Sequence, residues 1–110
     1  MPAFPCPALG AFVELHADRE EQILLQHPEI EDRFTELVET TLAEPDLVDR
    51  RADRPEIGVL RFWPDLRDGH FVVVVVRSDR DPGAESLRYW VVTVYITRNI
   101  ETWKSMWETR

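Results

Sequence analysis

Residues 28–43, PEIEDRFTELVETTLA, decide one half of the fold. Proline is favoured at the first position of a helix, and the acidic residues after it suit the positive end of the helix dipole. Apolar positions then recur every three or four residues, a spacing that places them on one side of a helix. We therefore predict a helix over 28–43 with one buried stripe, made of Ile30, Phe34, Leu37, Val38, Thr41 and Leu42.

The chain before this helix gives weaker signals. A shorter helix is expected over residues 18–26, and it ends there because Pro28 disfavours helical geometry at His27. Residues 11–16, AFVELH, have the composition of a short edge strand. Residues 1–10 are rich in proline, and we expect them to be irregular.

The second half of the chain changes to patterns typical of strands. Five consecutive valines within residues 70–77, HFVVVVVR, indicate a central strand that is buried on both faces. Further strands are predicted over 47–52, 57–63 and 87–96, and Asn99 is expected to begin a short C-terminal helix. The predicted fold is α+β: N-terminal helices packed on one face of an antiparallel sheet of about four strands, with a short C-terminal helix.

Length and composition limit the classes of function. A chain of 110 residues suits a single domain, 1–110, with one hydrophobic core. The single cysteine excludes an intramolecular disulfide and a cysteine-based metal site. Because no apolar run is long enough to span a membrane and no signal-peptide pattern is present, we expect a cytoplasmic protein without membrane association, metal or other cofactor. The net charge of −8 argues against general coating of nucleic acid, but it allows a local basic cleft or a basic protein partner.

Strand alternation predicts a face of the sheet that could carry chemistry. In the last strand, the apolar set Trp90, Val92, Val94 and Ile96 is expected to meet the long helix. The opposite set would then share its face with Arg61 and Trp63, giving one surface made of Arg61, Trp63, Tyr89, Thr93, Tyr95 and Thr97. A guanidinium with hydroxyl donors can stabilise phosphate charge, and aromatic rings can stack on bases. The alternative is that half-exposed strands simply favour threonine and aromatic residues.

His27 is the strongest single candidate for proton transfer. Histidine is the side chain best suited to this role near neutral pH, and His27 stands at the junction of two predicted helices. The alternative is a residue that caps a helix or packs at the junction. His16 and His70 have no spacing relation to His27 that indicates a metal site.

Two stretches resemble a known superfamily. ILLQHPEIEDRFTELVETTLAEPDLV at residues 23–48 and VVTVYIT at residues 91–97 resemble small domains of the barnase, EndoU, colicin E5/D and RelE-like nuclease superfamily. These domains occur in phage-encoded, polymorphic-toxin and toxin–antitoxin proteins. The resemblance implies a metal-independent ribonuclease in which His27 shuttles a proton, Arg61 holds the phosphate, and Thr93 and Tyr95 position it. Trp63, Tyr89 and Thr97 are the expected substrate-binding residues beside them.

The chain departs from the family pattern at three positions. The pattern commonly has a histidine five residues before the motif histidine and an arginine just before it, whereas this chain has Gln22 and Gln26. Val94 stands where a small residue is expected between Thr93 and the final tyrosine.

Two functions are therefore considered. The first is a toxin-type endoribonuclease that acts on RNA. The second is a degenerate nuclease-like scaffold that binds a protein such as an antitoxin, immunity protein or complex subunit. In the second, a C-terminal helix with Trp103 and Trp107 could anchor the partner, and the alternative is that this helix packs on the edge of the sheet.

Overall fold

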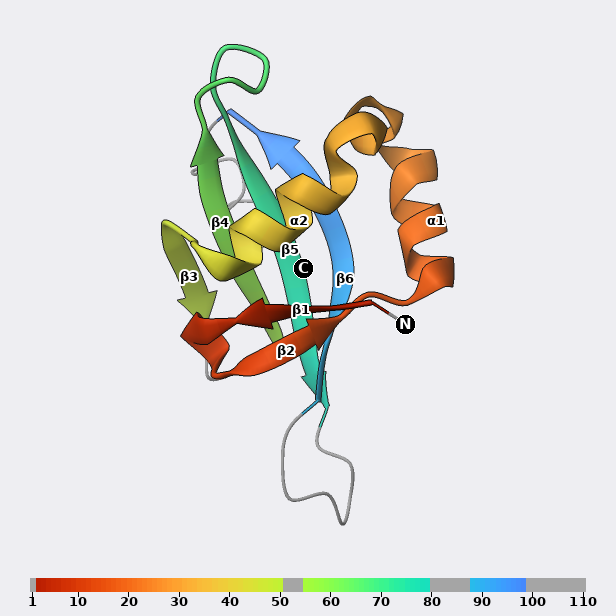
Figure 1. The fold of residues 1–110 in the computed structure, drawn as a ribbon, viewed down its shortest axis with the longest axis vertical. Coiled ribbons are helices and arrows are strands. Elements are labelled where there is room, and N and C mark those ends of the chain that lie inside the picture. Colours follow the sequence, from red (N-terminus) through yellow and green to blue (C-terminus); the bar gives the residue numbers. More distant parts are fainter. Residues whose placement is uncertain (1, 51–54, 80–87, 99–110) are drawn as a thin grey trace.

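Two helices lie against one side of a curled sheet (Figure 1). The computed structural model describes residues 2–50, 55–79 and 88–98. Within those ranges the helices are α1 (Ala17–Gln26) and α2 (Phe34–Ala43). The six strands are β1 (Ala3–Cys6), β2 (Ala11–Glu14), β3 (Leu47–Arg50), β4 (Glu56–Trp63), β5 (His70–Asp79) and β6 (Arg88–Thr97).

The strands follow the order β1-β2-β6-β5-β4-β3 across the sheet. All neighbours are antiparallel except β2 and β6, which run parallel over Val13–Tyr89 and Glu14–Trp90. The α+β class and the meander of β3, β4, β5 and β6 were therefore predicted correctly. The wholly antiparallel sheet of about four strands was wrong, because the sheet is mixed and β1 and β2 add to it.

A hairpin at the start of the chain accounts for the extra strands. β1 pairs antiparallel with β2, and the 3₁₀ helix Pro7–Leu9 connects them. Gly10 ends this connection with φ of 65°, a conformation that glycine adopts without steric cost. Phe4 and Cys6 are buried while Pro5 is exposed, and β1 is an edge strand, the position at which a sheet tolerates proline. The expectation of an irregular segment was wrong for residues 3–6, which form β1. A strand was correctly expected within residues 11–16, but it is not an edge strand, because β1 pairs with it.

The buried stripe of the long helix is confirmed. Ile30, Phe34, Leu37, Val38, Thr41 and Leu42 are all at most 3% exposed. The helix itself is divided, because a 3₁₀ helix covers Pro28–Arg33 and α2 begins at Phe34. Arg33 marks the break, with φ of −120° and ψ of 12°. The stripe still forms one surface, which packs α2 against β1, β4 and β5.

The main core fills the space between α2 and the sheet. It contains Val59, Val72, Val74, Val76 and Val94 from the central strands. A second buried group lies on the other side of the sheet and consists of Leu60, Val73 and Val75. Both faces of β5 are therefore buried, as its run of valines predicted.

The remaining expectations concern a C-terminal helix and a membrane-spanning segment. The C-terminal helix predicted from Asn99, with Trp103 and Trp107, lies outside the described residues. Among the helices that the structure describes, none has the length and apolar character needed to cross a membrane.

Candidate functional site

The residues predicted to form one site lie on two sides of the sheet. Arg61 and Trp63 face α2: the Arg61 guanidinium donates to the carbonyl oxygen of Glu44 at 2.6 Å. Trp63 Nε1 donates to Thr41 Oγ1 at 3.2 Å, and its side chain is 8% exposed. Thr93 pairs with Val75, which belongs to the buried group on the other side. The prediction that Arg61 and Trp63 share a face with Thr93, Tyr95 and Thr97 was wrong.

The pairing register explains this error. Trp63 lies on the same side as Val59, and Val59 pairs with Val74, which in turn pairs with Val94 on the helix side. Both alternating sets of β4 are rich in apolar residues, so alternation alone did not decide which set meets α2. The sheet buries Leu60 on the side away from the helices.

Tyr89 is separated from Thr93 and Tyr95 by a bulge in β6. Thr93 pairs with Val75 and Val91 with Val76, which leaves Val92 as an extra residue. The extra residue reverses the alternation on either side of it. Tyr89 is therefore 6% exposed within the core on the helix side, while Tyr95 packs against the buried group on the other side.

His27 forms the C-cap of α1 and remains half-buried, with its side chain 31% exposed. Its Nδ1 lies 3.3 Å from Oε1 of Glu29. The pKa of Glu29 is lowered first by a hydrogen bond from its own backbone and then by His27. These contacts fit the junction role that was the alternative for His27.

A different set of side chains surrounds a groove between α1 and β6. β2 pairs with β6 only at Tyr89 and Trp90, so the edge of β6 beyond them lies beside α1 (Figure 1). A first hollow of about 320 Å³ is lined by His16, Asp18, Arg19, Arg88, Trp90 and Val91. A second hollow of about 180 Å³ is lined by Arg19, Gln22, Ile23, Gln26, Val92 and Thr93. Arg19 lines both, and the two hollows together are called the groove below.

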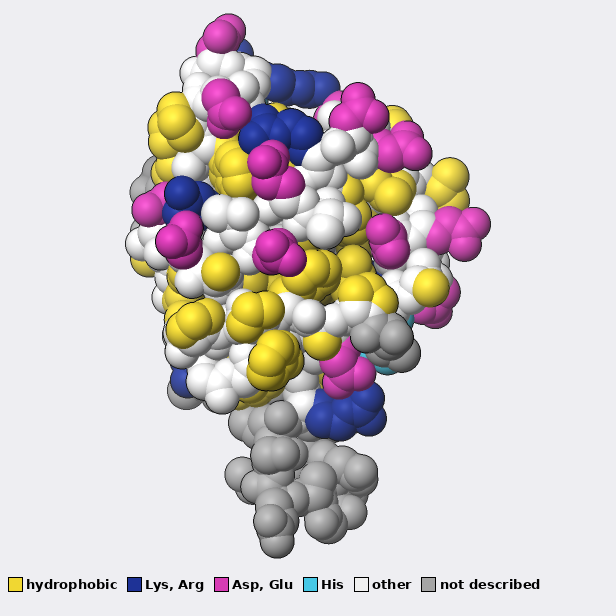
Figure 2. Space-filling model, viewed as in Figure 1, with side chains coloured by type: hydrophobic (Ala, Val, Ile, Leu, Met, Phe, Trp, Pro, Cys, Tyr) yellow, Lys and Arg dark blue, Asp and Glu magenta, His cyan; other side chains and the backbone are white. Residues whose placement is uncertain are grey.

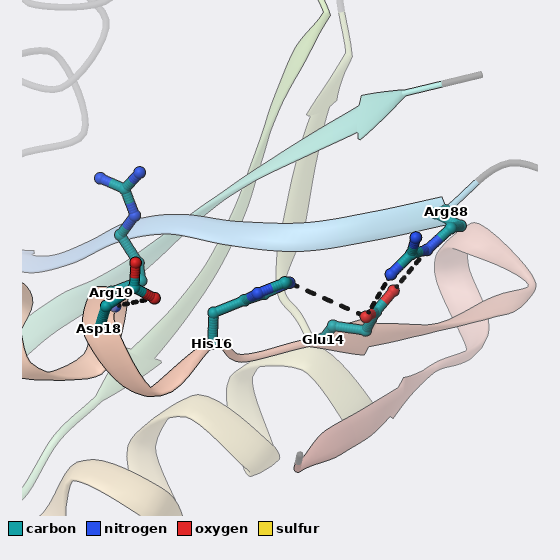
Figure 3. Close-up of polar contacts among 5 residues, drawn as sticks. All are labelled: Glu14, His16, Asp18, Arg19 and Arg88. Carbon is teal, nitrogen blue, oxygen red and sulfur yellow. Dashed lines mark hydrogen bonds and ion pairs between the residues drawn. The ribbon is translucent and has the colours of Figure 1, made fainter. Parts of the chain in front are cut away.

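Charges in the first hollow are arranged around Glu14. The Arg88 guanidinium donates two hydrogen bonds to its carboxylate, at 3.1 and 2.8 Å, and they hold the pKa of Glu14 below its usual range. His16 Nε2 lies 3.8 Å from the same carboxylate. Figure 3 shows Arg88 and His16 directed at Glu14, whereas the Arg19 guanidinium points away from the Asp18 carboxylate.

Arg19 is the cation best placed to receive an anion in this groove. Its guanidinium donates to a neutral group, Gln22 Oε1, at 3.2 Å. Arg88, in contrast, is offset by Glu14. An arginine whose charge is not neutralised can form two parallel hydrogen bonds to a phosphate. Beside it, Trp90 is a half-buried aromatic ring on which a base could stack.

Some of the groove could be found from the sequence. Gln22, Gln26 and Thr93 were already singled out, and they meet in the second hollow. Arg19, Gln22, Ile23 and Gln26 follow one another at helical spacing, which would have placed them on one side of α1. His16, Arg88 and Trp90 were missed, because only the pairing of β2 with β6 brings residues 14–16 and 88–90 together.

Neither a metal site among the described residues nor a similar protein indicates a function for this chain. Over the part of the chain that the structure describes, no three histidine, cysteine or acidic side chains gather as a metal site would require. Comparisons with protein-family models, with curated proteins and with solved structures give no match to the chain. The groove is therefore the feature from which a function is inferred.

Proposed function

We propose that the chain is a metal-independent ribonuclease-type domain that binds single-stranded RNA in the groove between α1 and β6. The observation that carries the proposal is the first hollow, where a histidine, two arginines and a tryptophan meet. These residues can supply a proton acceptor, a phosphate ligand and a stacking surface. The resemblance to the nuclease superfamily agrees with this class of reaction, although the residues differ from those that it implied.

The proposed reaction needs no metal. His16 accepts the proton of the RNA 2′-hydroxyl while the 2′-oxygen attacks the adjacent phosphorus. The bond from phosphorus to the 5′-oxygen breaks, and that oxygen takes a proton from water. The products are a 2′,3′-cyclic phosphate and a 5′-hydroxyl. Arg19 stabilises the added negative charge on the phosphoryl oxygens, and Glu14 stabilises the imidazolium that forms at His16.

The acidity of the chain restricts where RNA can bind. Figure 2 shows acidic side chains spread over the face that carries the helices. The net charge of −8 repels a polyanion from most of the surface. RNA is therefore expected to bind through few phosphate contacts, with Arg19 as the main one, and with stacking as the remaining source of affinity.

The test compares two histidines. The native protein, His16→Asn and His27→Asn are incubated with an end-labelled single-stranded RNA in chelator, and the product ends are identified. We expect cleavage by the native protein with 2′,3′-cyclic phosphate ends, and a loss of roughly 100-fold or more in His16→Asn. His27→Asn is the matched control and should retain cleavage. If only His27→Asn loses cleavage, the catalytic site lies at the helix junction and not in the groove. If the native protein does not cleave RNA, the proposed ribonuclease activity is refuted.

A protein-binding scaffold is the second candidate, and two exposed apolar residues favour it. Phe12 in β2 is 65% exposed and Leu25 in α1 is 77% exposed. Large apolar side chains at the surface are common at protein interfaces. If the scaffold function is correct, Leu25→Ser abolishes binding of a captured partner while Thr35→Ser, an exposed position in α2, leaves it unchanged. Equal capture by both variants would exclude Leu25 from the interface.

A further inference from the structure

The second hollow differs in chemistry from the first. Its inner side is apolar, with Ile23 at 1% exposure and Val92 half-buried. Its polar groups are the amides of Gln22 and Gln26 and the hydroxyl of Thr93. Among the described residues that line it, Arg19 is the only charged one, and Arg19 also lines the first hollow. A flat, uncharged and polar group suits such a surface better than a phosphate does, and a nucleobase is that kind of group.

The two amides are not equally available. Gln22 Oε1 accepts a hydrogen bond from Arg19, which fixes the orientation of that amide. The side-chain amide of Gln26 makes no hydrogen bond to another described residue. Its amide therefore presents both an acceptor and a donor to the hollow. Glutamine pairs in this way with adenine, since Oε1 accepts from the N6 amino group and Nε2 donates to N7.

We infer that Gln26 reads an adenine base in the second hollow, beside the phosphate held by Arg19. The inference rests on the proposed RNA-binding function and adds a sequence preference to it. Arg19 lines both hollows, so a phosphate bound there leaves the base of an adjoining nucleotide next to Gln26. Recognition of an unstacked base by its hydrogen-bonding edge is typical of proteins that bind single-stranded RNA. Ile23 and Val92 pack against the base, and Gln26 selects it.

The experiment measures binding rather than cleavage. Four labelled RNAs of eight nucleotides, each a uridine strand with A, C, G or U at one central position, are titrated with His16→Asn protein in chelator. Fluorescence anisotropy gives the dissociation constants. We expect the adenine strand to bind about ten-fold more tightly than the all-uridine strand. Adding Gln26→Met should remove that difference, because the thioether preserves the length of the side chain but not its hydrogen bonds.

Two further variants sharpen the result. Gln26→Glu keeps the shape but offers only acceptors, so the preference should move towards cytosine, whose N4 amino group donates. Glu21→Met is the control, because Glu21 is exposed on α1 and does not line the hollow, so the adenine preference should persist. Equal affinity for all four strands, preference for another base, or adenine preference that survives Gln26→Met would each overturn the inference while RNA binding stands. Failure to bind any strand would instead refute the proposed function.

Discussion

Replacing Thr41 by valine tests the side of the sheet on which Trp63 lies. Thr41 is fully buried on α2, and its hydroxyl oxygen accepts the indole N–H at 3.2 Å. Valine has nearly the same shape but cannot accept a hydrogen bond. The indole N–H would then be buried without a partner, which costs about 1–3 kcal/mol. The added methyl group returns part of that, so we expect a net loss of about 1–2 kcal/mol in the free energy of unfolding.

Urea unfolding followed by far-ultraviolet circular dichroism measures this loss. Thr35→Val is the matched control, because Thr35 is exposed on the same helix and should change stability by less than about 0.5 kcal/mol. A double-mutant cycle with Trp63→Phe isolates the hydrogen bond, and its coupling energy should be about 1 kcal/mol. Trp63→Phe also weakens the stacking of Arg33 and Arg61, whose guanidinium carbons lie 5.2 and 5.6 Å from the ring centre.

If Thr41→Val leaves the free energy of unfolding unchanged, the hydrogen bond from Trp63 to Thr41 is refuted. That result would mean that the indole does not face α2, and the placement of Trp63 and Arg61 on the side of Thr93 and Tyr95 would again be open. A large loss in Thr41→Val with no coupling to Trp63→Phe would assign the cost to packing around Thr41 instead. The hydrogen bond is supported only if Thr41→Val lowers the free energy of unfolding and this loss is coupled to Trp63→Phe.

Two further predictions concern the turn between β4 and β5 and the ion pair beside the groove. Gly69 has φ of 108°, and an added Cβ would lie 2.9 Å from the Phe62 ring, so Gly69→Ala should cost more than about 1–2 kcal/mol by thermal unfolding. Gly10→Ala should cost less, because its φ of 65° lies in the left-handed region that other residues can adopt and no atom lies within 4 Å of the added Cβ, and equal losses would contradict this combined effect of backbone and ring. Because Arg88 lowers the pKa of Glu14 in the folded state, the ion pair stabilises the fold above the unfolded pKa of about 4.3, and this is lost as pH falls through the lower folded value. Glu14→Gln should thus be less stable than the native protein at pH 7 by about 0.2–1 kcal/mol and equal to it near pH 2, and a difference independent of pH would exclude the ion pair as its cause.

Much of the fold could be predicted because it depends on local patterns. The apolar stripe of α2 and the valines of β5 are determined by burial along a helix and within a strand, so periodicity identified them. At the start of the chain β2 was expected as a short strand, but β1 was missed because its prolines suggested a loop. Phe4 and Cys6 nevertheless alternate with exposed residues there, and Pro5 is tolerated at an edge.

The candidate site was harder to predict because it depends on pairing between distant segments. One extra residue, Val92, changes which side chains of β6 share a face, and nothing in a run of apolar and aromatic residues marks a bulge. His27 was favoured over His16 because it stands in a recognisable motif. Of the neighbours that make His16 a candidate, Glu14 is close in the sequence, but Arg88 is brought to it only by the tertiary fold.

The parallel pairing of β2 with β6 has a consequence for how the chain is made. β6 lies between β2 and β5, so the first hairpin and the meander stay separate until residues 88–97 have left the ribosome. Joining Val13 to Tyr89 also closes a long loop of chain, which slows folding relative to contacts between near neighbours. Between the synthesis of β5 and that of β6, the nascent protein therefore carries two unpaired strand edges, one on β2 and one on β5. A product that stops before β6 would keep both edges open, and it is the form of this chain most exposed to aggregation and to capture by chaperones.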